Sequence, residues 1–206
     1  EERLLRPRMK AAVLYGKEDV RVESVDIPRL ERGDVLLRTR AALTCGTDAK
    51  VFRRGYHAKM IVPPAVFGHE IAGIVEEVGP GVEGVEPGTA VVAANSAPCG
   101  DCYYCKHEMP SLCDDLLFWN GAYAEFARIP ARVVRHNLVP LEEGVGFREA
   151  AMVEPLLQFS RAIKEETDGK KLVVLFYGYT FEISGIPMGP QNSGHLALAD
   201  LLASPD

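Results

Sequence analysis

Short runs of alternating or β-branched residues, separated by glycine and proline, dominate the chain from about Met9 to Val134. Such runs are typical of antiparallel strands, which bury one face and leave the other in water. Seven segments show the pattern: Lys10–Tyr15, Val20–Val25, Val35–Leu43, Ile71–Val78, Thr89–Ala94, Ala122–Arg128 and Arg132–Arg135. The sequence therefore predicts a mainly β unit with some α-helix, arranged as a barrel or a sandwich.

The pattern changes after Gly144, where helical composition replaces alternation. A helix is expected at Phe147–Glu154, and Pro155 must either end it or open the next helix. Three more elements are expected further on: a helix at Leu156–Glu166, a strand at Lys171–Phe176 and a short helix at His195–Ala203. We therefore expect two parts, residues 1–155 and a smaller α/β part at residues 156–206.

The composition of the chain limits the kinds of molecule that it is expected to bind. The 206 residues carry a net charge of −6 and are 47% hydrophobic, which suits a chain with a sizeable core. No cluster of lysine and arginine marks a surface for nucleic acid or anionic membrane, since both require concentrated positive charge. The longest apolar stretch, Leu172–Phe181, is too short to span a bilayer, and no signal peptide is visible. Closely spaced cysteines without a signal peptide suggest a reducing compartment, so we expect a cytoplasmic protein.

Four of the five cysteines, Cys99, Cys102, Cys105 and Cys113, lie within fifteen residues. Four thiolates complete the tetrahedral coordination of zinc and leave no open position, which is typical of a structural site. A ferredoxin-type iron–sulfur motif begins with the same spacings, but its fourth cysteine comes sooner and is followed by proline. We therefore predict a structural zinc ion here.

A second group of candidate ligands mixes residue types. Cys45 follows a predicted strand and His69 precedes one, so their side chains can converge where the strands end. Zinc accepts thiolate, imidazole and carboxylate ligands, and three protein ligands with an open fourth position are typical of a catalytic site. Glu154 is the candidate third ligand, because an acid at the end of an apolar helix is unfavourable unless it is paired or metal-bound. Asp48 is interpreted as a turn or capping residue.

Several motifs, in this order, resemble those of the zinc-containing medium-chain dehydrogenases. They are Lys10-Ala-Ala-Val-Leu, Cys45-Gly-Thr-Asp, Phe67-Gly-His-Glu, Gly79-Pro-Gly-Val, the four-cysteine segment and Glu154-Pro-Leu. The resemblance runs from about Met9 to Leu157 and is greatest toward the alcohol, polyol and threonine dehydrogenases. It implies a GroES-like, partly open β-barrel with a zinc-binding lobe.

The resemblance also implies roles for particular residues. Cys45, His69 and Glu154 match the catalytic-zinc ligands of that family, with Glu70 as an alternative ligand or a carboxylate behind the ligands. Thr47 matches the hydroxyl that relays the substrate proton. The implied cofactors are two zinc ions per chain and NAD(P), and the implied substrate is a small alcohol or polyol.

The resemblance stops where the family's nucleotide-binding domain would begin. No Gly-x-Gly-x-x-Gly motif follows Leu156, and the 51 residues of 156–206 are too few for six parallel strands and their crossovers. We therefore expect the chain to lack most of the Rossmann domain and residues 156–206 to be a remnant of it.

Three functions are compatible with this pattern, so whether the chain is an enzyme stays open. The preferred hypothesis is a dehydrogenase-derived zinc domain that does not bind NAD(P). The alternatives are an active dehydrogenase whose cofactor site is supplied otherwise, and a non-catalytic, zinc-stabilised module that self-associates. We expect a homo-oligomer, because self-association would cover apolar residues such as Leu156 and Phe159.

Overall fold

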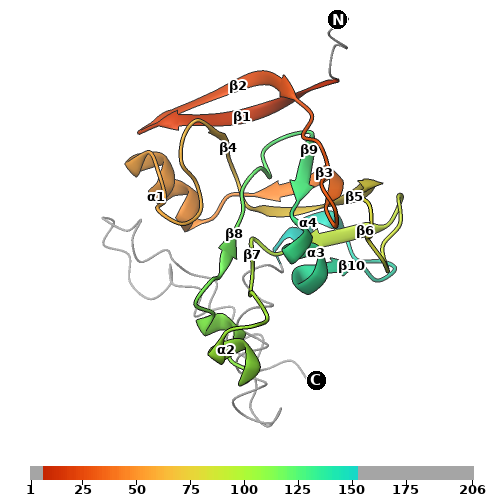
Figure 1. The fold of residues 1–206 in the computed structure, drawn as a ribbon. Coiled ribbons are helices and arrows are strands. Elements are labelled where there is room, and N and C mark those ends of the chain that lie inside the picture. Colours follow the sequence, from red (N-terminus) through yellow and green to blue (C-terminus); the bar gives the residue numbers. More distant parts are fainter. Residues whose placement is uncertain (1–6, 153–206) are drawn as a thin grey trace, which may run out of the picture. The chain divides into compact units, whose positions relative to one another are not determined.

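The computed structural model describes residues 7–152, which form three antiparallel sheets and four short α-helices (Figure 1). The strands are β1 (Arg8–Gly16), β2 (Asp19–Asp26), β3 (Val35–Leu43), β4 (Ala65–Val66), β5 (Glu70–Val78), β6 (Ala90–Ala93), β7 (Ser96–Ala97), β8 (Leu117–Phe118), β9 (Phe126–Ile129) and β10 (Leu138–Pro140). The helices are α1 (Gly46–Arg54), α2 (Tyr103–Lys106), α3 (Ala131–Asn137) and α4 (Phe147–Ala151), with a 3₁₀ turn at Pro110–Leu112. The predicted mainly β fold is confirmed.

The largest sheet has five strands in the order β10-β6-β5-β3-β9, each pair antiparallel. In a second sheet β1 lies between β2 and β4, and β7 pairs with β8 in a third. The backbone joins the first two sheets, since Ala12 N–H donates to the Tyr123 carbonyl at 2.8 Å and Glu125 N–H to the Lys10 carbonyl at 3.1 Å. Within residues 7–152 the edge strands β9 and β10 do not pair with each other, so the barrel is open along that edge, as predicted.

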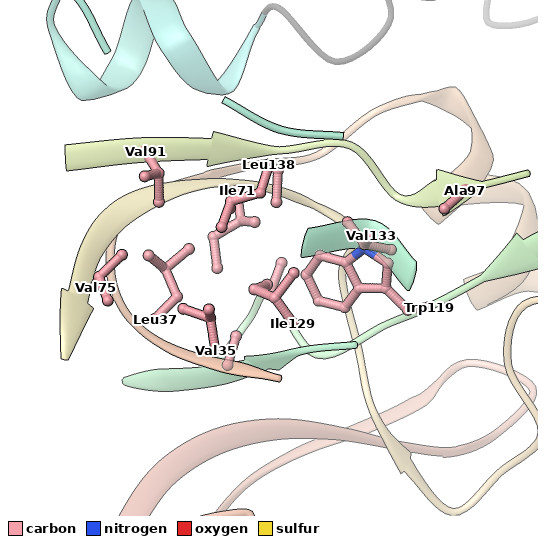
Figure 2. Close-up of a cluster of buried hydrophobic side chains, with 13 residues drawn as sticks. Val35, Leu37, Ile71, Val75, Val91, Ala97, Trp119, Ile129, Val133 and Leu138 are labelled. Carbon is pink, nitrogen blue, oxygen red and sulfur yellow. The ribbon is translucent and has the colours of Figure 1, made fainter. Parts of the chain in front are cut away.

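The main core gathers buried side chains from all five strands of the five-stranded sheet. Figure 2 shows the side chains of Leu37, Ile71 and Ile129 directed toward one another, and each is fully buried. Residues two apart on one strand share this face, which accounts for the alternation seen in the sequence. Trp119 lies beside Val133 in the same cluster, and its indole N–H donates to the Ala94 carbonyl at 2.7 Å. One packed core therefore holds together strands that are distant in the sequence.

The strand expected at Arg132–Arg135 is wrong, because these residues belong to helix α3. Two β-branched residues, Val133 and Val134, favoured a strand locally. Pro130 precedes the helix, and the N–H of Ala131 is satisfied by Oδ1 of Asp34 at 2.9 Å. The carboxylate of Asp34, the residue before β3, thus stabilises the start of a helix that lies far away in the sequence.

The helix expected from Phe147 is confirmed as α4, whose buried Ala150 and Ala151 pack against Ala72 of β5 and Val92 of β6. Among residues 7–152, no helix has both the length and the apolar content needed to cross a bilayer. Glu154, the elements expected beyond it and the boundary expected after residue 155 lie outside the described residues.

Candidate metal centres

Pairing of β3 with β5 assembles the first of two groups of metal-ligating side chains within the described part of the chain. Leu43, at the end of β3, is paired with Glu70, at the start of β5. The chain leaves β3 just before Cys45 and enters β5 just after His69, so the two side chains meet at one end of the pair. Sγ of Cys45 lies 3.3 Å from Nε2 of His69, although 24 residues separate them in the sequence.

Cys45 is the N-cap residue of helix α1, which begins at Gly46. Its backbone N–H donates to Oδ2 of Asp48 at 3.0 Å, and its sulfur accepts from the N–H of Thr47 at 3.3 Å. These reciprocal bonds form a capping box, so Asp48 has the capping role inferred from the sequence. The sulfur therefore lies at the positive end of a helix dipole and next to an N–H donor.

Asp48 also pairs with His69, a contact that the sequence did not predict. Nδ1 of His69 lies 3.0 Å from Oδ1 of Asp48, and the two side chains are only 3% and 1% exposed. Burial alone lowers the pKa of His69, but its hydrogen bonds to Asp48 and Cys45 raise that pKa to about 10. Burial likewise opposes ionisation of Asp48, yet its pairing with His69 holds its pKa below the usual value. Because Asp48 occupies Nδ1, the Nε2 atom of His69 faces Cys45, where it can bind a metal ion once it has released its proton.

Glu70 completes this group, which we call the mixed cluster: Cys45, His69 and Glu70. One ligand atom from each residue lies within 4.8 Å of the other two. Glu70 is buried, and burial, with the nearby charge of Asp48, raises the pKa of its carboxyl group. Thr47 lies in the first turn of α1 and is half-buried. The other candidate ligand, Glu154, lies outside the described residues, so Glu70 is the carboxylate that the described structure brings to Cys45 and His69.

The mixed cluster fits a zinc ion by its donors and by its spacing. Tetrahedral zinc with a sulfur at about 2.3 Å and a nitrogen at about 2.0 Å places these two atoms about 3.5 Å apart. The Sγ–Nε2 distance of 3.3 Å is close to this value. A thiolate and a carboxylate in a largely buried site are unfavourable without a nearby cation. Three protein ligands would leave one position open.

The second group, which we call the thiolate cluster, consists of Cys99, Cys102, Cys105 and Cys113. It lies between β7 and β8, where Cys102 directly precedes α2, Cys105 lies within α2 and Cys113 follows the 3₁₀ turn. Four sulfurs about 2.3 Å from a zinc ion would lie about 3.8 Å from one another. Sγ of Cys105 lies 3.9 Å from that of Cys99 and 3.5 Å from that of Cys102, and all four sulfurs lie within 4.8 Å. The spacing is that of a tetrahedral four-thiolate site.

Backbone N–H groups around the thiolate cluster favour negative sulfur. The N–H groups of Asp101 and Cys102 both donate to Sγ of Cys99 at 3.4 Å. N–H donors from Cys105 and Asp114 lower the pKa of Cys102 to about 6, whereas burial and the neighbouring sulfurs raise that of Cys105 to about 12. Sulfurs this close cannot all ionise without a cation, and a bound zinc ion would stabilise all four as thiolates.

Comparison with known proteins gives three findings. The family description that matches the chain is the alcohol dehydrogenase GroES-like domain, over residues 31–142. The L-threonine 3-dehydrogenase of Pyrococcus furiosus is 40% identical over 134 residues, which are 63% of this chain and 38% of that protein. A thermostable alcohol dehydrogenase from Pyrobaculum aerophilum, solved with cobalt and zinc bound, superposes with a TM-score of 0.65 at 29% identity over 76% of this chain and 49% of that one.

A further solved structure adds a cofactor to the comparison. It is a short chain alcohol dehydrogenase (rspB) from Escherichia coli CFT073 complexed with NADH, with a TM-score of 0.66 at 27% identity, covering 78% of this chain and 46% of that one. The chain spans about two fifths of the length of the curated threonine dehydrogenases that it matches.

Proposed function

Since the chain belongs to the family of alcohol dehydrogenase GroES-like domains, we propose that residues 7–152 supply the metal-binding and substrate-binding half of a zinc-dependent oxidoreductase. The observation that carries the proposal is the mixed cluster, in which a cysteine sulfur, an imidazole nitrogen and a carboxyl oxygen converge within 4.8 Å. Similarity to a threonine dehydrogenase and to an alcohol dehydrogenase supports a small alcohol, polyol or hydroxy amino acid as substrate.

Residues in and around the mixed cluster have separate roles in the proposed reaction. A zinc ion bound there would supply Lewis-acid chemistry and polarise the hydroxyl group of an alcohol substrate. Cys45 and His69 would hold the ion, and Asp48, beside Nδ1, orients the His69 ring so that Nε2 faces Cys45. Thr47, in the first turn of α1, passes the substrate proton toward solvent. Glu70 is either the third ligand or an exchanging carboxylate, and Glu154 is the alternative third ligand.

We also propose two zinc ions per chain, with the thiolate cluster in the structural role. Four thiolates leave no open position for substrate, so this ion stabilises the segment between β7 and β8. Reaction at the mixed cluster is a separate property. Removing the thiolate-cluster ion should therefore reduce stability first and activity only as a consequence.

Oxidation of an alcohol requires a hydride acceptor, and the family resemblance points to NAD(P). Because these 206 residues contain no Gly-x-Gly-x-x-Gly motif after Leu156, we propose that this polypeptide does not bind NAD(P) by itself. Titration of NADH against the chain, followed by the fluorescence of the cofactor, tests this proposal. Saturable binding would contradict it and would favour an active dehydrogenase. Self-association stays a prediction, and sedimentation at several concentrations tests it.

Cobalt substitution tests the proposed metal chemistry without requiring turnover. The full chain is loaded with Co²⁺, and its absorption bands are recorded while imidazole is added as a small ligand. We expect the bands of the mixed cluster to shift because its fourth position is open, and those of the thiolate cluster to stay unchanged. Bands that do not respond to imidazole would contradict a catalytic type of site. Repeating the spectrum in Glu70→Gln and in Glu154→Gln distinguishes the two candidate carboxylate ligands.

A further inference from the structure

Tyr123, a residue outside every recognised motif, lies between the two segments that carry Cys45 and His69. It is located between β8 and β9, and its backbone is held on both sides. Its N–H donates to the Phe67 carbonyl at 2.9 Å, and its carbonyl accepts from the Ala12 N–H at 2.8 Å. The backbone of Tyr123 is therefore held by Ala12 of β1 on one side and by Phe67, the residue after β4, on the other.

The ring of Tyr123 packs against the segment that leads into His69. It meets the ring of Phe67 edge-on, with centroids 5.5 Å apart and an interplanar angle of 78°. It also covers Gly68, since a Cβ atom placed there would lie 2.4 Å from the ring. Contact this close is available only because residue 68 has no side chain. The ring thus fixes the backbone immediately before His69.

The hydroxyl group of Tyr123 binds the other segment. It lies 2.9 Å from the Leu43 carbonyl oxygen and 2.9 Å from Oγ1 of Thr44, the residue before Cys45. Burial, together with the charge of Asp48, raises the pKa of Tyr123 above its usual value, so the phenol remains protonated and able to donate at neutral pH. One side chain therefore contacts the neighbours of both metal ligands, which are 24 residues apart in the sequence.

We infer that Tyr123 is a positioning residue of the mixed cluster: its ring on Gly68 and its hydroxyl on Thr44 set the separation between Cys45 and His69. The inference rests on the proposed function, because it assumes that these two residues hold a metal ion. Residues that orient metal ligands from behind typically change metal affinity about 10- to 100-fold when they are replaced. Loss of the hydroxyl group removes only part of the contact that Tyr123 makes. We therefore expect a decrease in metal affinity near the lower limit, about tenfold.

The test compares Tyr123→Phe with the wild type by titration of the metal-free full chain with Co²⁺. The variant keeps the ring on Gly68 and loses the hydroxyl group, with its bonds to Leu43 and Thr44 and its interaction with Asp48. Tyr15→Phe is the matched control, because it loses a hydroxyl bond of the same length, 2.9 Å to Glu23, at an exposed site on β1. The thiolate cluster, with a spectrum set by four sulfurs, is an internal reference in every titration.

We expect Tyr123→Phe to weaken Co²⁺ binding at the mixed cluster about tenfold and to shift its d–d bands, with the thiolate-cluster bands unchanged. Tyr15→Phe should change neither. Wild-type affinity and wild-type bands in Tyr123→Phe would overturn the inference, even if the melting temperature fell. A wild-type chain without mixed-cluster bands would overturn the proposed function as well, so the two failures are distinguishable.

A second variant covers the case in which Tyr123→Phe does not fold. Thr44→Val removes the other hydroxyl of the same contact at an exposed position and keeps the shape of the side chain. It should weaken Co²⁺ binding at the mixed cluster in the same direction, and the double variant should be no weaker than Tyr123→Phe alone. Unchanged affinity in Thr44→Val, or additive losses in the double variant, would overturn the inference.

Discussion

Replacement of Gly68 by alanine should destabilise the chain more than its backbone conformation alone explains. Gly68 has φ = +84°, a left-handed conformation that disfavours any residue with a side chain by about 1–2 kcal/mol. An added Cβ would also lie 2.4–2.6 Å from three atoms of the Tyr123 ring. Because the backbone bonds of Tyr123 prevent a simple retreat of the ring, we add about 1–3 kcal/mol for overpacking. The total expected loss is about 2–5 kcal/mol.

Gly84→Ala is the matched control for this prediction. Gly84 has nearly the same conformation, φ = +76°, but no atom lies within 4 Å of the position that its Cβ would take. It should therefore lose only the conformational term. With both variants saturated with zinc, the difference between their urea midpoints, multiplied by the common m-value, gives the energy of the clash.

Equal losses in Gly68→Ala and Gly84→Ala would refute the reasoning, because the clash would then have no measurable energy. A double-mutant cycle gives a second check. Tyr123→Ala should be less destabilising in the Gly68→Ala background than in the wild type, since the ring is already displaced there. Additive losses would contradict direct contact between the two positions.

Three further predictions concern charged and metal-ligating residues. Asp48→Asn should weaken zinc binding at the mixed cluster about 10- to 100-fold in a chelator competition assay, because Asp48 pairs with His69. The control is Asp34→Asn, at an equally buried carboxylate that pairs with Arg128, which should destabilise the chain without changing that affinity. Cys102→Ser should lower the melting temperature, with a loss of about 4 kcal/mol in the free energy of unfolding if free zinc exceeds the Kd a thousandfold. A chelator should lower the melting temperature of the wild type toward that of the variant. His136 has a pKa below its usual value because of burial and then of Arg135 and Arg132, so its protonation opposes folding as the pH falls through about 6.5. His136→Gln should therefore gain thermal stability relative to the wild type at pH 5.5 but not at pH 8, and an equal difference at both values would contradict this assignment.

The parts of the fold that the sequence predicted well are those with strong local signals. β3 was expected at Val35–Leu43 and is observed with these bounds. The thiolate cluster was predicted from spacing alone, because four close cysteines leave few arrangements. Helix α3 was missed because its start depends on Asp34, almost a hundred residues earlier in the chain, which no local pattern reports.

The mixed cluster was predicted only in part, for the same physical reason. Cys45 and His69 could be placed at strand ends, but their 3.3 Å approach depends on the β3–β5 register, in which Leu43 pairs with Glu70. The capping role of Asp48 follows from its position three residues after Cys45, whereas its contact with His69 depends on tertiary structure. Tyr123 reaches Thr44 across 79 residues, and nothing in its sequence neighbourhood distinguishes it from a core aromatic residue.

The zinc content of Cys45→Ser tests the central claim of two separate metal sites most directly. Elemental analysis of the purified wild-type chain should give about two zinc ions per chain, one in each cluster. Cys45→Ser should retain about one ion and a melting profile that still responds to chelation, because the thiolate cluster is intact. A variant that keeps both ions, or a wild-type chain that binds only one, would contradict the account.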